Sequence, residues 1–128
     1  MNIPEDLLYT KEHEWARVEG KKAKFGITDY AQSSLGDITF IELPDEQKEI
    51  EQAKPYSTVE SVKAASDVYA PLSGKVVDIN SSLLDKPEAV NSAPYEEGWF
   101  IQIEIKDEKE KDSLMSAADY KKYIEGIK

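Results

Sequence analysis

Residues 56–77 read YSTVESVKAASDVYAPLSGKVV and contain two short strand patterns, 56–62 and 67–70, on either side of Lys63. We expect these strands to form a hairpin with Lys63 at its tip, where the amine projects into water. The small side chains at 64–66 would let another protein's active site close around that amine. This geometry suits a lysine that a second enzyme modifies, because a catalytic lysine needs burial to lower its pKa. The plainer alternative for a lysine at a turn is an ordinary surface charge.

Short strands also dominate the rest of the chain. The residues between 98 and 105 alternate most cleanly, with Trp99, Ile101 and Ile103 on one face and the polar Gln102 and Glu104 on the other. The other expected strands are 14–19 and 22–27 around the turn Gly20-Lys21, 37–43 ending at Pro44, and 74–80. Short strands separated by turn residues predict an antiparallel β sandwich or barrel.

Two helices interrupt this pattern. The first spans 28–35, with Thr28 as its N-terminal cap and Gly36 as a left-handed stop. The second lies near the C-terminus, where Ser116 has capping-box spacing to Asp119. Behind it, one apolar stripe is formed by Tyr120, Tyr123, Ile124 and Ile127. The charged run 106–112 is expected to be a solvated connector or helical turn.

Composition narrows the classes of function. The chain has 128 residues, with 16 Lys and Arg against 26 Asp and Glu, which gives a net charge of −10. This length predicts a single domain, residues 1–128. The acidic balance argues against nucleic acid and against an anionic membrane surface, because both attract basic proteins. It favours basic faces on partner proteins, or else serves only solubility.

The sequence holds no Cys and a single His, His13. Thiolate chemistry, disulfides and a His or Cys metal site are therefore excluded, and no nucleophile, base and orienting group can be assembled for catalysis. We expect His13 to be packed or hydrogen-bonded, and the protein to be a monomer without enzymatic activity of its own. Residues 1–6 show no targeting pattern, so we expect the cytoplasm of a prokaryote, or a compartment reached by a peptide already removed.

Four stretches of the sequence resemble the glycine cleavage system H-protein family, in the family's order, from about residue 7 to residue 120. They are 60–67 with 70–74, 9–15, 26–32 with 35–37, and 90–95 with 98–99. The first is similar to the family's lipoyl-attachment region. The resemblance implies a mainly β barrel-sandwich hybrid of the lipoyl/biotinyl-carrier type, with short helices and a C-terminal helix.

The resemblance also implies a role for Lys63, which would carry lipoate attached as an amide by a lipoate-attaching enzyme. Such a protein is a carrier and not an enzyme. It takes the aminomethyl group of glycine from a pyridoxal-phosphate glycine decarboxylase and delivers it to a tetrahydrofolate-dependent aminomethyltransferase. A dihydrolipoamide dehydrogenase, which uses FAD, then reoxidises the dithiol.

Family members hold the loaded arm in a surface cleft, and the resemblance places Glu14 and Asp67 beside the cationic amine there. A nearby carboxylate favours an ammonium, more strongly in a partly dry cleft. Glu12 is a further candidate, since we expect it on the same strand face as Glu14. Glu60 is a candidate for recognition by the lipoate-attaching enzyme. The alternative is that these carboxylates are simply solvated charges at strand ends and edges.

The sequence departs from the family between 45 and 57, where the family often has glycines and this chain has none. Ser57 stands where a glycine is common. Because other residues disfavour a positive φ, we expect these turns to be rebuilt or helical.

Two other functions remain open from the sequence. One is a lipoyl carrier of the same fold that relays lipoate to other proteins, and the other is an unmodified acidic adaptor. Biotin attachment is a further variant, but the neighbours of Lys63 are Val62 and Ala64 and not the methionines usual in biotinyl domains.

Overall fold

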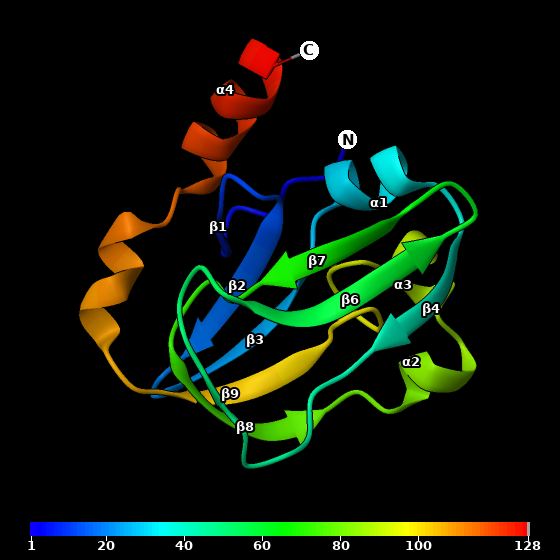
Figure 1. The fold of residues 1–128 in the computed structure, drawn as a ribbon. Helices are drawn as coiled ribbons and strands as arrows, with labels where there is room; N and C mark the ends of the chain where they lie inside the picture. The colour runs from blue at the N-terminus through cyan, green and yellow to red at the C-terminus, as the bar shows by residue number, and fades with distance from the viewer. Residues whose placement is uncertain (128) are drawn as a thin grey trace.

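Two antiparallel sheets face each other in the computed structural model, which describes residues 1–127 (Figure 1). The larger sheet contains, in spatial order, β1 (Leu8–Tyr9), β2 (Glu14–Glu19), β3 (Lys22–Ile27), β9 (Ile101–Ile105), β8 (Gly74–Ile79) and β5 (Glu49–Ile50). The smaller sheet contains β4 (Ile38–Glu42), β6 (Pro55–Ser61) and β7 (Ala65–Tyr69). The predicted antiparallel β sandwich is confirmed.

The main core lies between these sheets and follows from the alternation of the strands. In β9, Ile101 and Ile103 are fully buried while Glu104 is exposed. Their neighbours in this core include Phe25, Ile41, Val59, Leu72 and Val76, all with no exposed surface. Burying side chains of this size stabilises the fold by about 1.5–3 kcal/mol each, which is why the sandwich closes without any disulfide.

The two predicted helices are present. In α1 (Asp29–Leu35), the Thr28 hydroxyl accepts the amide N–H of Ala31 at 3.2 Å, and Gly36 ends the helix with φ 80°. In α4 (Ala117–Ile127), the Ser116 hydroxyl accepts the amide N–H of Asp119 at 3.2 Å. Sequence reasoning missed two single-turn helices, α2 (Ser82–Asp85) and α3 (Ala89–Ser92). The charged run became a 3₁₀ helix, η1 (Glu108–Ser113).

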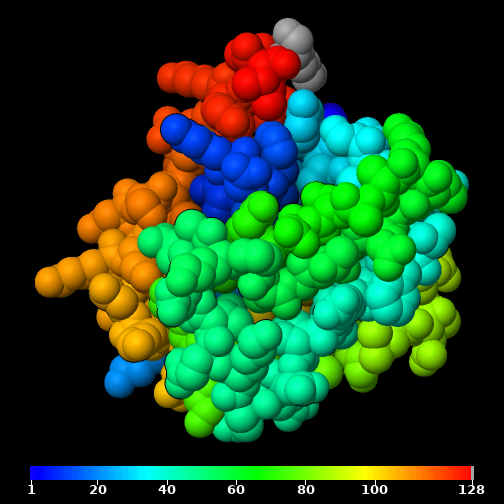
Figure 2. All heavy atoms as spheres, in the orientation of Figure 1, coloured from blue at the N-terminus to red at the C-terminus, as the bar shows by residue number. Residues whose placement is uncertain are grey.

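A second apolar cluster attaches α4 to the N-terminal segment. The ring of Tyr120 in α4 stacks on Tyr9 in β1, with 4.6 Å between the ring centroids. Tyr9 and Met115 form an isolated β-bridge through two backbone hydrogen bonds of 2.8 Å. In Figure 2 the N-terminal residues therefore lie directly under α4, and the β6–β7 hairpin runs across the same face towards α1.

The glycine-free segment 45–57 contains no helix, so the helical alternative was wrong. Instead, Gln47 and Ala53 adopt the left-handed conformation themselves, with φ of 75° and 67°. Backbone hydrogen bonds hold them there: the amide of Gln47 donates to Val76 at 2.7 Å, and that of Ala53 donates to Ala70 at 2.8 Å. Ser57 does not have positive φ; its hydroxyl donates to the carbonyl of Glu42.

Replacing Ala53 by glycine should stabilise the protein. The left-handed conformation costs an L-residue roughly 1–2 kcal/mol, part of which is offset by the larger chain entropy of unfolded glycine. We expect Ala53→Gly to raise the free energy of unfolding in urea by about 0.5–1 kcal/mol. The control, Ala118→Gly on the exposed face of α4, should lower it by about 1 kcal/mol. A loss of stability in both variants would show that Ala53 is not strained.

Candidate functional site

Lys63 lies at the tip of the β6–β7 hairpin, and its side chain is exposed, as the sequence predicted. Its amine does not stand clear of the protein, however, because Nζ lies 3.4 Å from the carbonyl oxygen of Ser34. The turn is closed locally: the amide of Ser61 donates to the carbonyl of Ala64 at 2.8 Å. The Ser61 hydroxyl accepts the amide N–H groups of Lys63 and Ala64, each at 3.2 Å. The amide of Val62 donates to the carbonyl of Asp37 at 3.2 Å, which fixes the tip against the start of β4. The backbone that carries the amine is therefore well defined.

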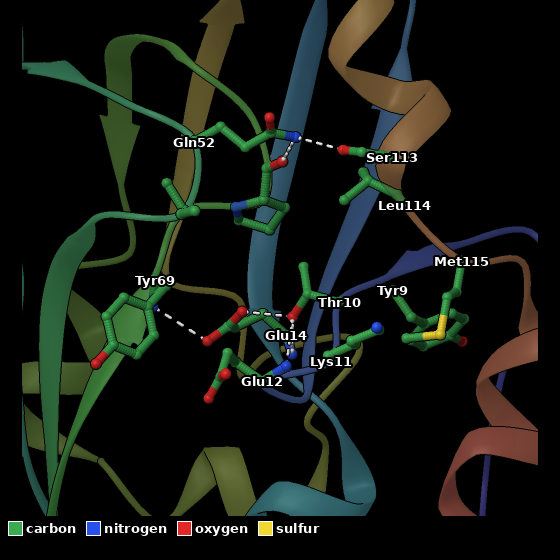
Figure 3. Close-up of a pocket in the computed structure, with 13 residues that line it drawn as sticks. Tyr9, Thr10, Lys11, Glu12, Glu14, Gln52, Tyr69, Ser113, Leu114 and Met115 are labelled. Carbon is green, nitrogen blue, oxygen red and sulfur yellow. Dashed lines mark hydrogen bonds between the residues drawn. The ribbon is translucent and has the colours of Figure 1, made fainter.

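A cavity of about 370 Å³ opens near the other end of the same hairpin (Figure 3). Its walls come from the segment before β2, the bend before β6, the end of β7, and the connection between η1 and α4. The residues are 9–12 and 14, 52–53, 69–71 and 113–115. Gln52 ties two of these walls together, because its Nε2 donates to the carbonyl of Pro71 and to Ser113 Oγ, both at 2.9 Å.

Glu14 is the buried carboxylate of this cavity, with only 2% of its surface exposed. Its Oε1 accepts the hydroxyl of Thr10 at 2.5 Å, and its Oε2 accepts the amide N–H of Tyr69 at 3.1 Å. Glu14 is the first residue of β2 and Tyr69 is the last residue of β7. A single side chain therefore connects the larger sheet to the smaller one.

Burial raises the pKa of Glu14 to about 7, against the lowering effect of the hydrogen bonds from Thr10 and Tyr69. The negative charge of Glu12 raises this pKa further. Desolvation is the leading cause because the buried carboxylate has lost its water, and no salt bridge within residues 1–127 compensates for that loss. The group is thus poised to become ionised when a cation enters the cavity.

The other predicted carboxylates are placed differently. Glu12 lines the same cavity and is exposed, but it lies in a turn and not on a strand. The expectation that it shares a strand face with Glu14 was wrong, because His13 has φ 69° and interrupts the alternation. Asp67 is exposed on β7, opposite Thr58, and is not among the described residues that line the cavity.

Glu60 is exposed on β6, where it pairs with Ala65 across the hairpin. It therefore lies on the strand that leads to Lys63, and it is not among the described residues that line the cavity. Its proposed role in recognition by an attaching enzyme is compatible with that exposure.

His13 is packed and hydrogen-bonded, as expected. Its Nδ1 lies 2.8 Å from the hydroxyl of Tyr120, and its ring centroid is 4.5 Å from that of Tyr30. Burial lowers its pKa. Within residues 1–127, no three His, Cys, Asp or Glu side chains are grouped so that they could hold a metal ion. No helix in that range is both long and apolar enough to cross a membrane.

Sequence reasoning missed Thr10 and Asn91 as positioning residues. The hydroxyl of Thr10 accepts the amide N–H groups of Glu12 and Glu14, each at 3.2 Å, a local turn that Thr followed by polar residues often forms. Asn91 belongs to α3. Its side chain accepts the amide of Ile38 and donates to the carbonyl of Gly36, both at 2.9 Å, so it joins α3 to the α1–β4 connection.

The raised pKa of Glu14 makes stability depend on pH. Below 4.5 the carboxyl is protonated in both folded and unfolded chains, whereas between 4.5 and about 7 only the unfolded chain ionises. Folding stability contributed by this group is thus lost as pH rises through that interval. A rise in pKa from 4.5 to about 7 corresponds to about 3 kcal/mol.

We therefore expect the free energy of unfolding of the wild type, relative to Glu14→Gln, to fall by up to about 3 kcal/mol between pH 4 and pH 8. Urea unfolding at both values measures this difference. Glu12→Gln, which changes an exposed carboxyl, is the control and should track the wild type. A constant difference between wild type and Glu14→Gln across the range would contradict the burial argument.

Comparison with known proteins agrees with the fold. Residues 7–127 match the family model described as Glycine cleavage H-protein. The chain is 50% identical over 127 residues to the glycine cleavage system H protein of Halothermothrix orenii, covering 99% of both chains. It is 56% identical over 120 residues to that of Geobacillus thermodenitrificans, covering 94% of both.

A solved structure shows the same architecture. The crystal structure of a glycine cleavage system H protein from Mycobacterium marinum superimposes with a TM-score of 0.82 at 31% identity. The match covers 92% of this chain and 95% of that chain. With sequence, family model and architecture in agreement over nearly the whole length, this chain belongs to the glycine cleavage H-protein family.

Proposed function

We propose that this protein is the lipoyl carrier of the glycine cleavage system, with lipoate attached as an amide to Lys63. The observation that carries the proposal is the exposed amine at the tip of a rigid hairpin, in a chain that belongs to the H-protein family. When bound, the lipoyl group supplies a disulfide that accepts an aminomethyl group and is afterwards reoxidised. Everything else required of this chain is to present, protect and release that group.

The residues around Lys63 fit such an attachment. Ala64, Ala65 and Ser66 are small and exposed, so the residues that follow Lys63 present no bulky side chain to an attaching enzyme. Along β7, the four steps from Ala65 to Tyr69 cover about 13 Å at the usual rise of a strand. The lysyl–lipoyl arm starts at Lys63, two residues before β7, and when extended its roughly twelve bonds reach about 15 Å. Its end would therefore come towards the end of β7, where Tyr69 lines the cavity.

Within that cavity we propose that Glu14 holds a cationic amine carried on the arm. Within residues 1–127 its buried carboxylate forms no salt bridge, although Lys11 lines the same cavity. Its pKa of about 7 means that an entering ammonium shifts it to the ionised form. Asp67 lies two residues before Tyr69 on β7, so it would meet the arm between the tip and the cavity. Glu12, at the rim, adds negative charge and is the weaker contributor.

The partners follow from the same proposal. They are the pyridoxal-phosphate glycine decarboxylase, the tetrahydrofolate-dependent aminomethyltransferase, the FAD-containing dihydrolipoamide dehydrogenase and a lipoate-attaching enzyme. We propose that they perform the catalysis, that this chain acts as a carrier in the cytoplasm, and that Glu60 contributes to recognition during attachment. The net charge of −10 favours encounter with basic faces on these enzymes.

Intact-mass measurement tests the attachment. Protein from a lipoate-replete host should gain one lipoyl increment, which Lys63→Ala should lose and Lys75→Ala, an exposed lysine on β8, should keep. A wild-type chain that remains bare after incubation with lipoate and a competent attaching enzyme would favour the unmodified adaptor.

A second assay separates the glycine carrier from a lipoate relay. The lipoylated wild type should support exchange of bicarbonate with the carboxyl group of glycine when mixed with the decarboxylase. The unmodified chain should not. A lipoylated chain that fails in this exchange but donates lipoate to other proteins would identify the relay function instead.

The proposed roles of Glu14 and Asp67 predict that each protects the carried amine. We expect Glu14→Gln and Asp67→Asn to release formaldehyde from the loaded protein roughly fivefold faster than wild type, as expected when a nearby opposite charge is removed. Glu42→Gln, an exposed carboxyl on β4, is the matched control. Equal release rates in all four proteins would show that neither Glu14 nor Asp67 protects the carried amine.

A further inference from the structure

The unmodified Lys63 side chain does not extend freely into water. It lies against the C-terminal end of α1, where its Nζ donates to the carbonyl oxygen of Ser34 at 3.4 Å. Its Cε lies so close to Gly36 that a Cβ built on that glycine would be 3.2 Å away. The aliphatic stem and the charged head of Lys63 therefore both contact residues 34–36.

This end of α1 is suited to an ammonium. The last carbonyls of a helix lack partners within the helix and form its negative end. The last turn of α1 contains no basic residue of its own. A cation that interacts with these carbonyls therefore comes from another part of the fold. Figure 1 shows the tip of the β6–β7 hairpin on the same side of the molecule as α1, and the Lys63 side chain at that tip supplies the cation.

The backbone beneath Lys63 is held from two sides. Asn91 donates to the carbonyl of Gly36 and to Gln32 Oε1, and it accepts the amide of Ile38, with all three distances at 2.9 Å. On the other side, the amide of Val62 donates to Asp37. The tip and the end of α1 are thus fixed relative to each other before Lys63 makes its contact.

We propose that residues 34–36 form a resting site for the Lys63 ammonium, which the side chain occupies before its modification and leaves afterwards. Acylation converts the charged amine into a neutral amide, so the attraction to the helix carbonyls is lost. Gly36 acts as a positioning residue, since a Cβ there would lie 3.2 Å from the Lys63 Cε and the lysine stem would have to move away from it. The link to cofactor attachment rests on the proposed function, but the resting site itself does not.

Gly36→Ala tests the site, and Gly20→Ala is its matched control. Both glycines have positive φ, 80° and 63°, so both substitutions strain a turn. Only the Cβ at position 36 would meet Lys63, while a Cβ at position 20 has no atom within 4 Å. Gly36 also has ψ −155°, a conformation that is largely confined to glycine, so Gly36→Ala carries more backbone strain than Gly20→Ala. The NMR measurement on the unsubstituted chain separates the contact with Lys63 from that strain.

The probe is N-hydroxysuccinimidyl acetate. The Lys63 amine attacks the ester carbonyl, the amide C–N bond forms, the ester C–O bond breaks, and N-hydroxysuccinimide leaves while the proton passes to buffer. Peptide-level mass spectrometry follows Lys63 relative to Lys48, an exposed lysine elsewhere. Displacing Lys63 from a helix end should speed its acetylation about two- to fivefold in Gly36→Ala, with no change in Gly20→Ala. Equal Lys63 rates in wild type and both variants would overturn the proposal.

A measurement on the unsubstituted backbone makes the test independent of folding in the variants. In the unmodified chain, NMR should show a nuclear Overhauser contact between the Lys63 ε-methylene and the Gly36 α-protons. A chain carrying biosynthetically incorporated acetyl-lysine at position 63 should lack it. Absence of the contact from the unmodified chain, or its persistence after acetylation, would refute the resting site.

Both readouts use acetylation and no lipoate-attaching enzyme. A Lys63 that rests on α1 but is never lipoylated would defeat the proposed function and leave the resting site standing. A chain that is lipoylated at Lys63, but whose unmodified Lys63 lacks this contact, would do the opposite.

Discussion

The hydrogen bonds of the buried Glu14 carboxylate are the interaction on which the arrangement of this protein depends. One oxygen is bound by Thr10, before β2, and the other by the backbone of Tyr69, at the end of β7. Unlike the apolar contacts between the sheets, these bonds are directional, so they fix where β7 ends against the larger sheet. The hairpin then carries Lys63 away from this anchor and towards α1.

Burying the Glu14 carboxylate costs free energy because its charged form loses hydration, and the raised pKa of Glu14 reflects this loss. A glutamine could accept from Thr10 or from Tyr69 through its single oxygen, but it would turn an N–H₂ group towards the other donor. A carboxylate alone satisfies both donors. The chain therefore tolerates a poorly solvated acid at this position, and the same acid lines the cavity.

The sequence was sufficient for features whose cause is local. Thr28 and Gly36 bound α1, and the turn at Gly20 joins β2 to β3, because caps and tight turns depend on a few adjacent residues. The position of Lys63 at a hairpin tip could be predicted for the same reason, because it depends on the residues next to it in the sequence. The resemblance to a family then assigned that tip a chemical role, which its local pattern alone left as one alternative among several.

Features that depend on distant segments escaped sequence reasoning. The cavity is lined by residues near 10, 52, 70 and 114, and no pattern in the sequence predicts that these segments lie together. Asn91 illustrates the same limit: its turn propensity was clear, but its bonds to Gly36 and Ile38 exist only because α3 packs beside α1. Ala53 shows the reverse case, where backbone bonds override a residue's own preference for negative φ.

The distance between tip and cavity explains how one hairpin could serve two states of its lysine. The free Lys63 side chain spans only about 6 Å, whereas β7 alone separates the tip from Tyr69 by about 13 Å. An unmodified ammonium cannot reach Glu14, however favourable their attraction, and the carbonyl of Ser34 is the negative group that it meets instead. Lengthening the side chain removes its charge and brings the cavity into range in the same step. The length and the charge of the Lys63 side chain therefore determine whether it lies at the carbonyl of Ser34 or extends towards the cavity at Glu14. No rearrangement of the backbone is needed for this choice.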